Sequence, residues 1–211
     1  MRINQKDMET RASVEFPGKD IIPNPLLEVY YEIDVQSTAA AVWPWIKQLG
    51  YHRGGWYIDT KWDKYIQKYF WPLVVPKNAR GFYKPPADKI LPEYQNLTAG
   101  DLIPDGPPNS AYYQVVDIKE NQLLVLHATS HFKYMAPNFM YKTRFAPKGQ
   151  FCWAFLLQQQ NKDVVRLTSW LQAEAYPELM FRLLKPFFKL VDRLHQQQIL
   201  VGIKRRVEKN T

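Results

Sequence analysis

Three stretches of the chain alternate apolar and polar residues, and each alternation predicts a β-strand with one buried face. The first runs from Leu27 to Val35, and the other two, Phe151 to Gln158 and Val164 to Ala175, adjoin a turn around Asn161. Pairing Phe151 opposite Leu171 keeps aromatic and aliphatic residues of both strands on one face. Slipping that register by one residue would mix polar and apolar side chains, so the pattern itself favours an antiparallel pair.

Weaker patterns predict further elements between these strands. Tyr112 to Ile118 and Leu123 to Ala128 are typical of a hairpin, and Phe139 to Phe145 alternates again. Helices are predicted from Ala39 to Leu49, between the cap residues Ser37-Thr38 and Gly50, and from Asp59 to Phe70. The proline-rich stretch from Trp71 to Gly106 predicts no element.

The C-terminal run from Pro177 to about Glu208 carries the longest helical signal. Its apolar residues recur at three- and four-residue steps, with basic and polar residues between them: Leu179, Leu183, Leu184, Phe187, Val191, Leu194, Leu200 and Ile203. This single stripe predicts a helix laid across a sheet. Pro186 removes a backbone N–H inside it, which predicts a kink or break between Leu183 and Phe187.

This order of elements predicts one α+β domain with a curved antiparallel sheet of about seven strands wrapped around the long C-terminal helix. Two short helices follow the first strand. We expect residues 1–26 to form an N-terminal arm and residues 27–209 to form the domain.

Composition and charge narrow the class of protein. The net charge of +8 and the pI of about 9.4 favour acidic partners, but the only dense basic cluster is Lys204-Arg205-Arg206, and no nucleic-acid motif accompanies it. The single cysteine, Cys152, excludes an internal disulfide. No signal peptide and no apolar run of about 20 residues are visible. We therefore expect a soluble cytoplasmic protein that binds no nucleic acid and has no transmembrane segment.

Four stretches resemble the SRPBCC superfamily, also called START-like or helix-grip proteins, and particularly its bacterial polyketide cyclase/dehydrase or lipid-transport branch. They are the segment from Val35 to Gly50, the turn Arg53-Gly54-Gly55-Trp56-Tyr57, the segment Trp153 to Leu157 followed by Arg166-Leu167, and the ending Gly202 to Glu208. Their order spans the chain from about residue 28 to 208. Trp170 stands where relatives often carry Arg, and the stretch from Phe70 to Pro92 is richer in aromatics and proline than expected.

The resemblance implies a deep cavity between sheet and helix for an apolar molecule, and it implies no catalytic set or cofactor. Its lining is expected from the inward faces of the strands, the glycine turn and the kinked helix: Trp56, Tyr57, Phe151, Trp153, Phe155, Leu167, Ser169 and Phe187. For the strand residues, core and pocket wall remain equal alternatives. Ser169 is either a polar contact for the ligand or a small packing residue.

No group of residues forms a catalytic signature. His127, Tyr57 and Tyr113 are the residues that a general acid–base mechanism would use, although Leu124 and Leu126 occupy the face opposite His127, which predicts that this histidine points to solvent. His127 and His131 have no neighbouring carboxylate that would complete a zinc site, so no metal is expected. Asp101 and Asp105, which flank Pro104, are interpreted as turn formers.

Three hypotheses follow. The first is a protein that binds or transports a small apolar ligand such as a lipid or a polyketide-like molecule. The second is a cyclase or dehydratase that works in the same cavity. The third is peripheral membrane or protein contact through the basic face of the last helix. The sequence leaves the ligand, any reaction and the oligomeric state open.

Overall fold

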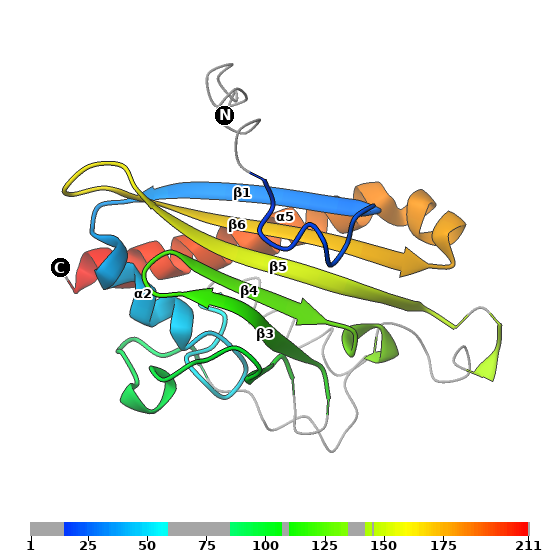
Figure 1. Cartoon of the computed structure of the whole chain (residues 1–211), viewed down its shortest axis with the longest axis horizontal. Helices are drawn as coiled ribbons and strands as arrows, with labels where there is room; N and C mark the ends of the chain where they lie inside the picture. The colour runs from blue at the N-terminus through cyan, green and yellow to red at the C-terminus, as the bar shows by residue number, and fades with distance from the viewer. Residues whose placement is uncertain (1–14, 59–84, 107–109, 135–141, 145, 211) are drawn as a thin grey trace.

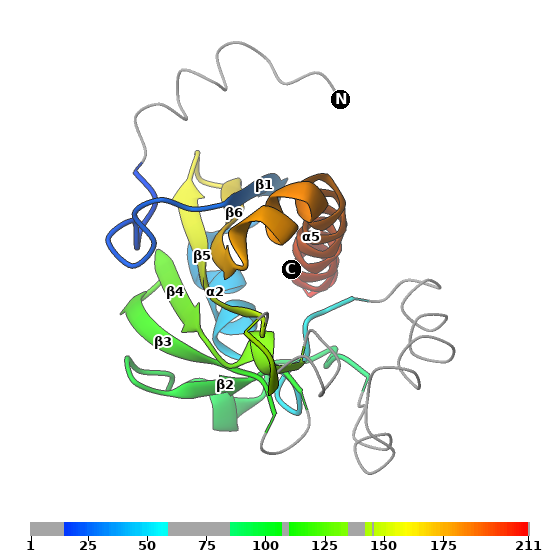
Figure 2. The same ribbon diagram turned by 90° about the vertical axis from the view of Figure 1, so that its right-hand side faces the viewer.

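The fold is a curved antiparallel sheet with one long helix on its concave side (Figures 1 and 2). The structure is a computed structural model that describes residues 15–58, 85–106, 110–134, 142–144 and 146–210. Six strands lie in the order β1-β6-β5-β4-β3-β2. Their bounds are β1 Leu27–Val35, β2 Leu102–Pro104, β3 Tyr112–Lys119, β4 Leu123–Ala128, β5 Lys148–Gln159 and β6 Val165–Tyr176. The predicted α+β class is confirmed, with six strands among the described residues instead of about seven.

The β5–β6 hairpin follows the predicted faces but not the predicted partners. Phe151 lies opposite Ala173, and Trp153 lies opposite Leu171, so the register is displaced by two residues. A shift of two leaves every side chain on its face because the strand repeat is two residues. The strands close on the turn after Gln159, where the N–H of Gln160 donates to the carbonyl of Val164 (2.9 Å).

Where the structure describes them, the connections contain the α-helix α2 and two short 3₁₀ helices. α2, Ala39–Lys47, starts at Thr38, whose side-chain oxygen accepts from the N–H of Ala41 and satisfies one of the free donors of the first turn. The 3₁₀ helices η3 and η4 span Pro92–Tyr94 and His131–Tyr134. The predicted helix from Asp59 to Phe70 lies outside the described residues, as does most of the predicted strand from Phe139 to Phe145.

The last helix, α5, runs without interruption from Glu178 to Lys209 with Pro186 inside it. Both ribbon views show its orange first turns running at an angle to the red remainder. A bend is therefore present, and a break is not. The second half is firmly seated, because Ile199, Leu200, Ile203 and Val207 are buried in the core.

The single apolar stripe predicted for this helix is wrong in its first half. Leu179, Leu183 and Phe187 expose 73%, 74% and 61% of their surface, and Leu190, Val191 and Leu194 are also exposed. The sheet covers instead a different line of residues, represented by Phe181 and the half-buried Phe188. Helical spacing alone could not separate these two faces, because both consist of large apolar residues.

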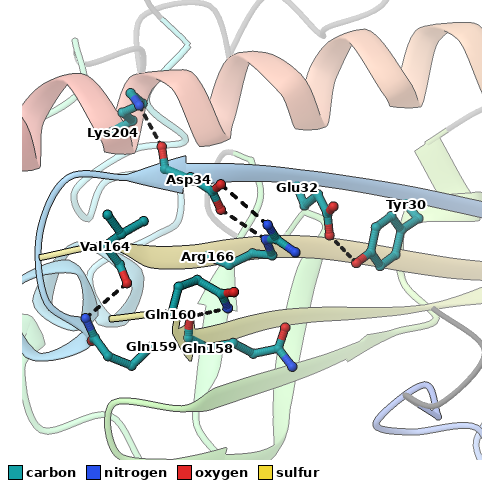
Figure 3. Close-up of polar contacts among 9 residues, drawn as sticks. All are labelled: Tyr30, Glu32, Asp34, Gln158, Gln159, Gln160, Val164, Arg166 and Lys204. Carbon is teal, nitrogen blue, oxygen red and sulfur yellow. Dashed lines mark hydrogen bonds and ion pairs between the residues drawn. The ribbon is translucent and has the colours of Figure 1, made fainter. Parts of the chain in front are cut away.

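The edge strand β1 ties the sheet to the second half of α5 (Figure 3). Arg166 on β6 donates from Nε to Asp34 Oδ1 (3.0 Å), and Lys204 on α5 donates from Nζ to the backbone oxygen of Asp34 (2.6 Å). On the same face of β1, Tyr30 donates its hydroxyl proton to Glu32. Charged side chains on an exposed strand also disfavour pairing with a second sheet.

The convex face of the sheet is covered in part by the residues that precede β1. Phe16 and Ile22 are buried there against Leu123, Val125 and Cys152. The thiol of Cys152 is enclosed, and burial raises its pKa to about 12, so the thiolate does not form at neutral pH. In the part of the chain that the structure describes, no helix combines the length and apolarity needed to cross a membrane.

Candidate functional site

A small apolar cavity lies between the concave face of the sheet and the first half of α5. Its volume is about 70 Å³, and ten residues line it: Leu26, Leu27, Phe132, Phe151, Ala173, Ala175, Phe181, Lys185, Phe188 and Asp192. Small-molecule sites usually offer roughly 300–1,000 Å³. The cavity therefore lies where a ligand site is expected. In this conformation its volume is only a fraction of that of a usual small-molecule site.

The cavity exists because small and large residues alternate between neighbouring strands. Ala173 and Ala175 on β6 face inward beside Phe151 on β5, and their missing side-chain volume leaves space under α5. Phe132 stacks on Phe151 with ring centroids 5.0 Å apart and closes one side. Phe181 meets Phe132 edge to face at 5.8 Å from the helix side, so rings surround most of the space.

Two charged residues of α5, Lys185 and Asp192, also line the cavity beside these apolar side chains. Burial raises the pKa of the Asp192 carboxyl to about 6, because the ionised form loses its hydration. A carboxyl group that is partly protonated near neutral pH can donate as well as accept a hydrogen bond. The cavity thus has one polar group whose character changes with pH.

An aromatic cluster around Trp153 continues the site from the cavity toward the glycine turn. Trp56 stacks on Trp153 at 5.3 Å between centroids, and Phe155 lies 4.8 Å away. Tyr113 on β3 packs at 5.6 Å and His195 on α5 at 6.3 Å. Residues from β3, β5, α5 and the loop after α2 therefore converge on one indole ring.

Polar atoms inside this cluster form a short relay. Trp153 donates from Nε1 to Ser169 Oγ (2.7 Å), and Ser169 donates to Gln196 Oε1 (2.8 Å). Gln196 Nε2 and Trp56 Nε1 are buried, and neither has a hydrogen-bond partner among the described residues. Unsatisfied buried donors are rare, and each costs about 1–3 kcal/mol. An acceptor oxygen within hydrogen-bond distance would satisfy either of these donors.

Beside the cluster, His131 and Asp105 form a close pair. His131 Nε2 lies 2.8 Å from Asp105 Oδ2, and the imidazole lies 4.5 Å from the ring of Tyr113 between centroids. His131 Nδ1 is buried without a partner in the described part of the chain. In the neutral imidazole, a carboxylate at Nε2 favours the tautomer with the proton on that nitrogen, in which the lone pair lies on Nδ1. Asp105 is thus more than a turn former.

Desolvation shifts the other titratable groups of the cluster. Burial raises the pKa of Tyr113 well above its usual value, and the negative charges of Asp105 and Asp192 raise it further. Tyr113 therefore stays protonated and can act as a donor. Burial lowers the pKa of His195, and the carboxylate of Asp105 opposes that shift. His195 is therefore mostly neutral at pH 7.

The residues expected to line a ligand site fall into three groups. Phe151 lines the cavity, and Trp56, Trp153 and Ser169 belong to the adjoining cluster. Tyr57 and Leu167 are fully buried in the main core, and so is Phe155, although its ring also packs on Trp153. The hydroxyl of Tyr57 donates to the carbonyl of Trp45 (2.9 Å). Phe187 is exposed, and its neighbour Phe188 takes the place in the cavity wall.

Of the three catalytic candidates, Tyr113 alone lies in the cluster. His127 lies opposite Cys152 on the face away from Leu124 and Leu126, as predicted, but it is half-buried and pairs through Nε2 with Gln150 Oε1 (2.7 Å) instead of pointing to solvent. Sequence reasoning missed Asp105, Asp192 and His195 as site residues. Asp192 and His195 follow Phe188 by four and seven positions and so share its side of the helix, a signal that was hidden by the wrong choice of stripe.

The basic ending of α5 is structural. Arg206 is buried, donates from Nε to the carbonyl of Ala87 (2.7 Å) and pairs with Asp88 (3.1 Å). Lys204 pairs with Glu208 (3.2 Å) as well as with the Asp34 carbonyl. Lys204 and Arg206 therefore make contacts within the chain, and Arg205 is the exposed residue of the cluster.

Comparisons with known proteins support the fold. No protein-family model and no curated protein matches the sequence. A hypothetical protein of Helicobacter pylori has a similar structure, with a TM-score of 0.51 and 13% identity over 97% of both chains. A Mesorhizobium loti protein matches at a TM-score of 0.47 and 8% identity, over 87% of this chain and 98% of the other.

Norcoclaurine synthase from Thalictrum flavum, in complex with dopamine and hydroxybenzaldehyde, matches at a TM-score of 0.43 and 12% identity over 87% of both chains. Such identities concern the fold alone. The helix-grip fold predicted from the resemblance is confirmed by the six-stranded antiparallel sheet and the long helix α5 of this chain, and the similarity to the Helicobacter pylori protein agrees with it. In the described residues, no group of three or more His, Cys, Asp and Glu is placed to hold a metal ion.

Proposed function

We propose that this protein binds a small, mainly apolar molecule in the cavity between its sheet and the first half of α5. The observation that carries the proposal is the apolar space walled by Phe132, Phe151, Phe181 and Phe188, with Asp192 at its edge. The unpartnered donors of Trp56 and Gln196 belong to the adjoining cluster and do not line the cavity, so an acceptor oxygen would reach them only on a ligand that extends beyond the cavity.

A lipid-sized or ring-sized ligand needs more than the present volume. The first half of α5 is the wall best suited to move, because most of its side chains face solvent and few hold it to the sheet. Displacing that wall would enlarge the cavity without disturbing Ile199, Leu200 and Ile203 in the core. Ligand binding and helix displacement are thus coupled in this proposal.

The test is a thermal-shift and native mass spectrometry screen with fatty acids and aromatic ketones. A variant that fills the cavity, Ala173→Leu, should lose binding, because Ala173 lines the space. Ala40→Leu adds the same volume on an exposed face of α2 and serves as the matched control. The proposal is wrong if no compound shifts the melting temperature, or if both variants behave alike.

A second candidate function is general acid–base catalysis on a carbonyl compound, and the His131–Asp105 pair favours it. His131 Nδ1 would take a proton from carbon next to the carbonyl, and the electron pair left behind would form an enolate. The hydroxyl of Tyr113, which stays protonated, would donate a hydrogen bond to the enolate oxygen. The proton would then return from Nδ1 to the product.

Deuterium exchange at the α-carbon of an aromatic ketone tests this step without knowledge of the natural substrate. The wild type should accelerate exchange, and His131→Asn should abolish the acceleration. His127→Asn is the matched control, since this histidine lies on the convex face of the sheet. If both variants lose the acceleration equally, or if the wild type does not accelerate exchange, the catalytic proposal is wrong and ligand binding alone stands.

A further inference from the structure

The first half of α5 has a second apolar face that the fold leaves in solvent. Leu179, Leu183, Phe187, Leu190 and Leu194 follow one another at three- and four-residue steps and therefore form one line along the helix. All five are exposed, the first two by nearly three quarters of their surface. Contiguous apolar surface of this kind usually marks a contact site.

A row of cations borders that face. Arg182, Lys189 and Arg193 succeed one another at seven- and four-residue steps, so they share a side of the helix next to the exposed leucines, and all three are exposed. Arg182 is partly neutralised by Glu178 (2.9 Å). The only acidic residue farther along this half, Asp192, is turned toward the cavity. The exposed face therefore combines leucine and phenylalanine with positive charge.

This combination identifies the partner chemically. A second copy of the chain would bring the same cations together across a twofold interface, which opposes pairing. An anionic lipid surface accepts both features at once, because its headgroups attract the cations while the side chains of leucine and phenylalanine enter the acyl boundary. We propose that the first half of α5 docks onto the surface of an anionic membrane.

The docking face and the cavity share one piece of helix. Phe181, Lys185, Phe188 and Asp192 wall the cavity from the same turns whose opposite side carries the exposed leucines. Docking on the membrane would thus act on the movable wall of the cavity. The docking itself does not depend on the proposed ligand binding, and the two are tested by different assays.

The test is co-sedimentation of the full chain with vesicles of phosphatidylcholine, with and without phosphatidylglycerol. Binding should require phosphatidylglycerol and weaken as salt is added. Leu183→Ser with Leu190→Ser should reduce partitioning at least about tenfold, because two inserted side chains are lost. Lys189→Gln with Arg193→Gln should reduce it by roughly fivefold for each charge removed.

Matched controls separate this face from general surface effects. Leu102→Ser removes an exposed leucine of β2, and Lys148→Gln with Lys162→Gln removes two charges at the ends of the β5–β6 hairpin. Both should bind as the wild type does. The proposal is overturned if the wild type ignores anionic vesicles, if the controls bind equally poorly, or if the leucine variant instead abolishes self-association in size-exclusion chromatography. The thermal-shift assay with cavity ligands reports separately whether these exposed variants keep the fold.

Discussion

At the scale of single residues, Ser169 shows how much the interior of the site depends on one hydroxyl. It accepts from Trp153 Nε1 and donates to Gln196 Oε1, and both partners are buried. The sequence left open whether it packs or contacts a ligand. The structure gives its hydroxyl two internal partners, so removing it strands an indole N–H and an amide oxygen without water.

Ser169→Ala should therefore lower the free energy of unfolding by about 2 kcal/mol or more, since each buried polar group left unpaired costs about 1–3 kcal/mol. Urea denaturation measures this loss. In a Trp153→Phe background the N–H is already absent, so the same substitution should cost less. Purely additive effects of the two substitutions would contradict the relay.

The raised pKa of Asp192 predicts that the stability of the protein depends on pH. Its pKa is about 6 in the folded protein and near 3.8 when unfolded, so between these values the folded state holds the proton more tightly. The unfolded state then binds fewer protons, and stability falls as pH rises through this window. Above about pH 6 the penalty is constant at about 3 kcal/mol, because each pKa unit corresponds to about 1.4 kcal/mol.

Asp192→Asn should remove that penalty. Compared with the wild type, it should be more stable at pH 8 by up to about 3 kcal/mol, and the difference should vanish near pH 4. Urea denaturation at several pH values gives both numbers. Asp163→Asn, in the exposed turn between β5 and β6, is the control and should show no such trend. A difference that does not depend on pH would contradict the assigned burial of Asp192.

At the scale of elements, α5 approaches the glycine turn so closely at Gly202 that no side chain fits between them. A Cβ added to Gly202 would lie 2.0 Å from the backbone oxygen of Tyr57, a distance that no packing adjustment of side chains can relieve. The helix therefore needs glycine there, although glycine is a poor helix former in general. The resemblance placed Gly202 in a helix-ending motif, and the structure supplies its physical reason.

Gly202→Ala should destabilise the protein by more than about 2 kcal/mol, as overpacking usually does. Helix propensity alone would predict the opposite, a gain of about 1 kcal/mol. Val201→Ala, at the neighbouring exposed position, is the control and should change stability by less than about 0.5 kcal/mol. Thermal and urea denaturation of the three proteins decide between the two expectations.

The elements themselves were predictable where one face of the chain differed from the other. Alternation located β1, β5 and β6, and because a shift of two residues preserves faces, even the misplaced partners of Phe151 left its orientation right. It could not locate β2, which has three residues. The buried face of α5 could not be identified for a different reason: apolar residues occupy both sides of its first half.

The candidate site was less predictable than the elements. His131 and Asp105 form a pair although they lie 26 positions apart, and nothing local in the sequence brings them together.

At the scale of the whole molecule, α5 has two parts with different roles. The second half is part of the core, with Ile199, Leu200 and Ile203 fully buried and Lys204 fastened to β1. The first half touches the sheet through few residues and carries the cavity wall on one side and an exposed apolar face on the other. Pro186 further weakens the first half. It has no backbone N–H, so the carbonyl of Arg182 lacks the hydrogen-bond donor that a regular helix would provide.

These observations predict a gradient of hydrogen exchange along one continuous helix. Amides from residue 178 to 194 should exchange faster than those from residue 196 to 207, since local opening of the first half exposes little buried surface. A cavity ligand or an anionic vesicle should slow exchange in the first half and leave the second half unchanged. The two effects are distinguishable, because Ala173→Leu should remove only the response to ligand, and Leu183→Ser with Leu190→Ser only the response to vesicles. Equal protection along the whole helix would mean that the wall is rigid, and the cavity could then accept only molecules that fit its present volume.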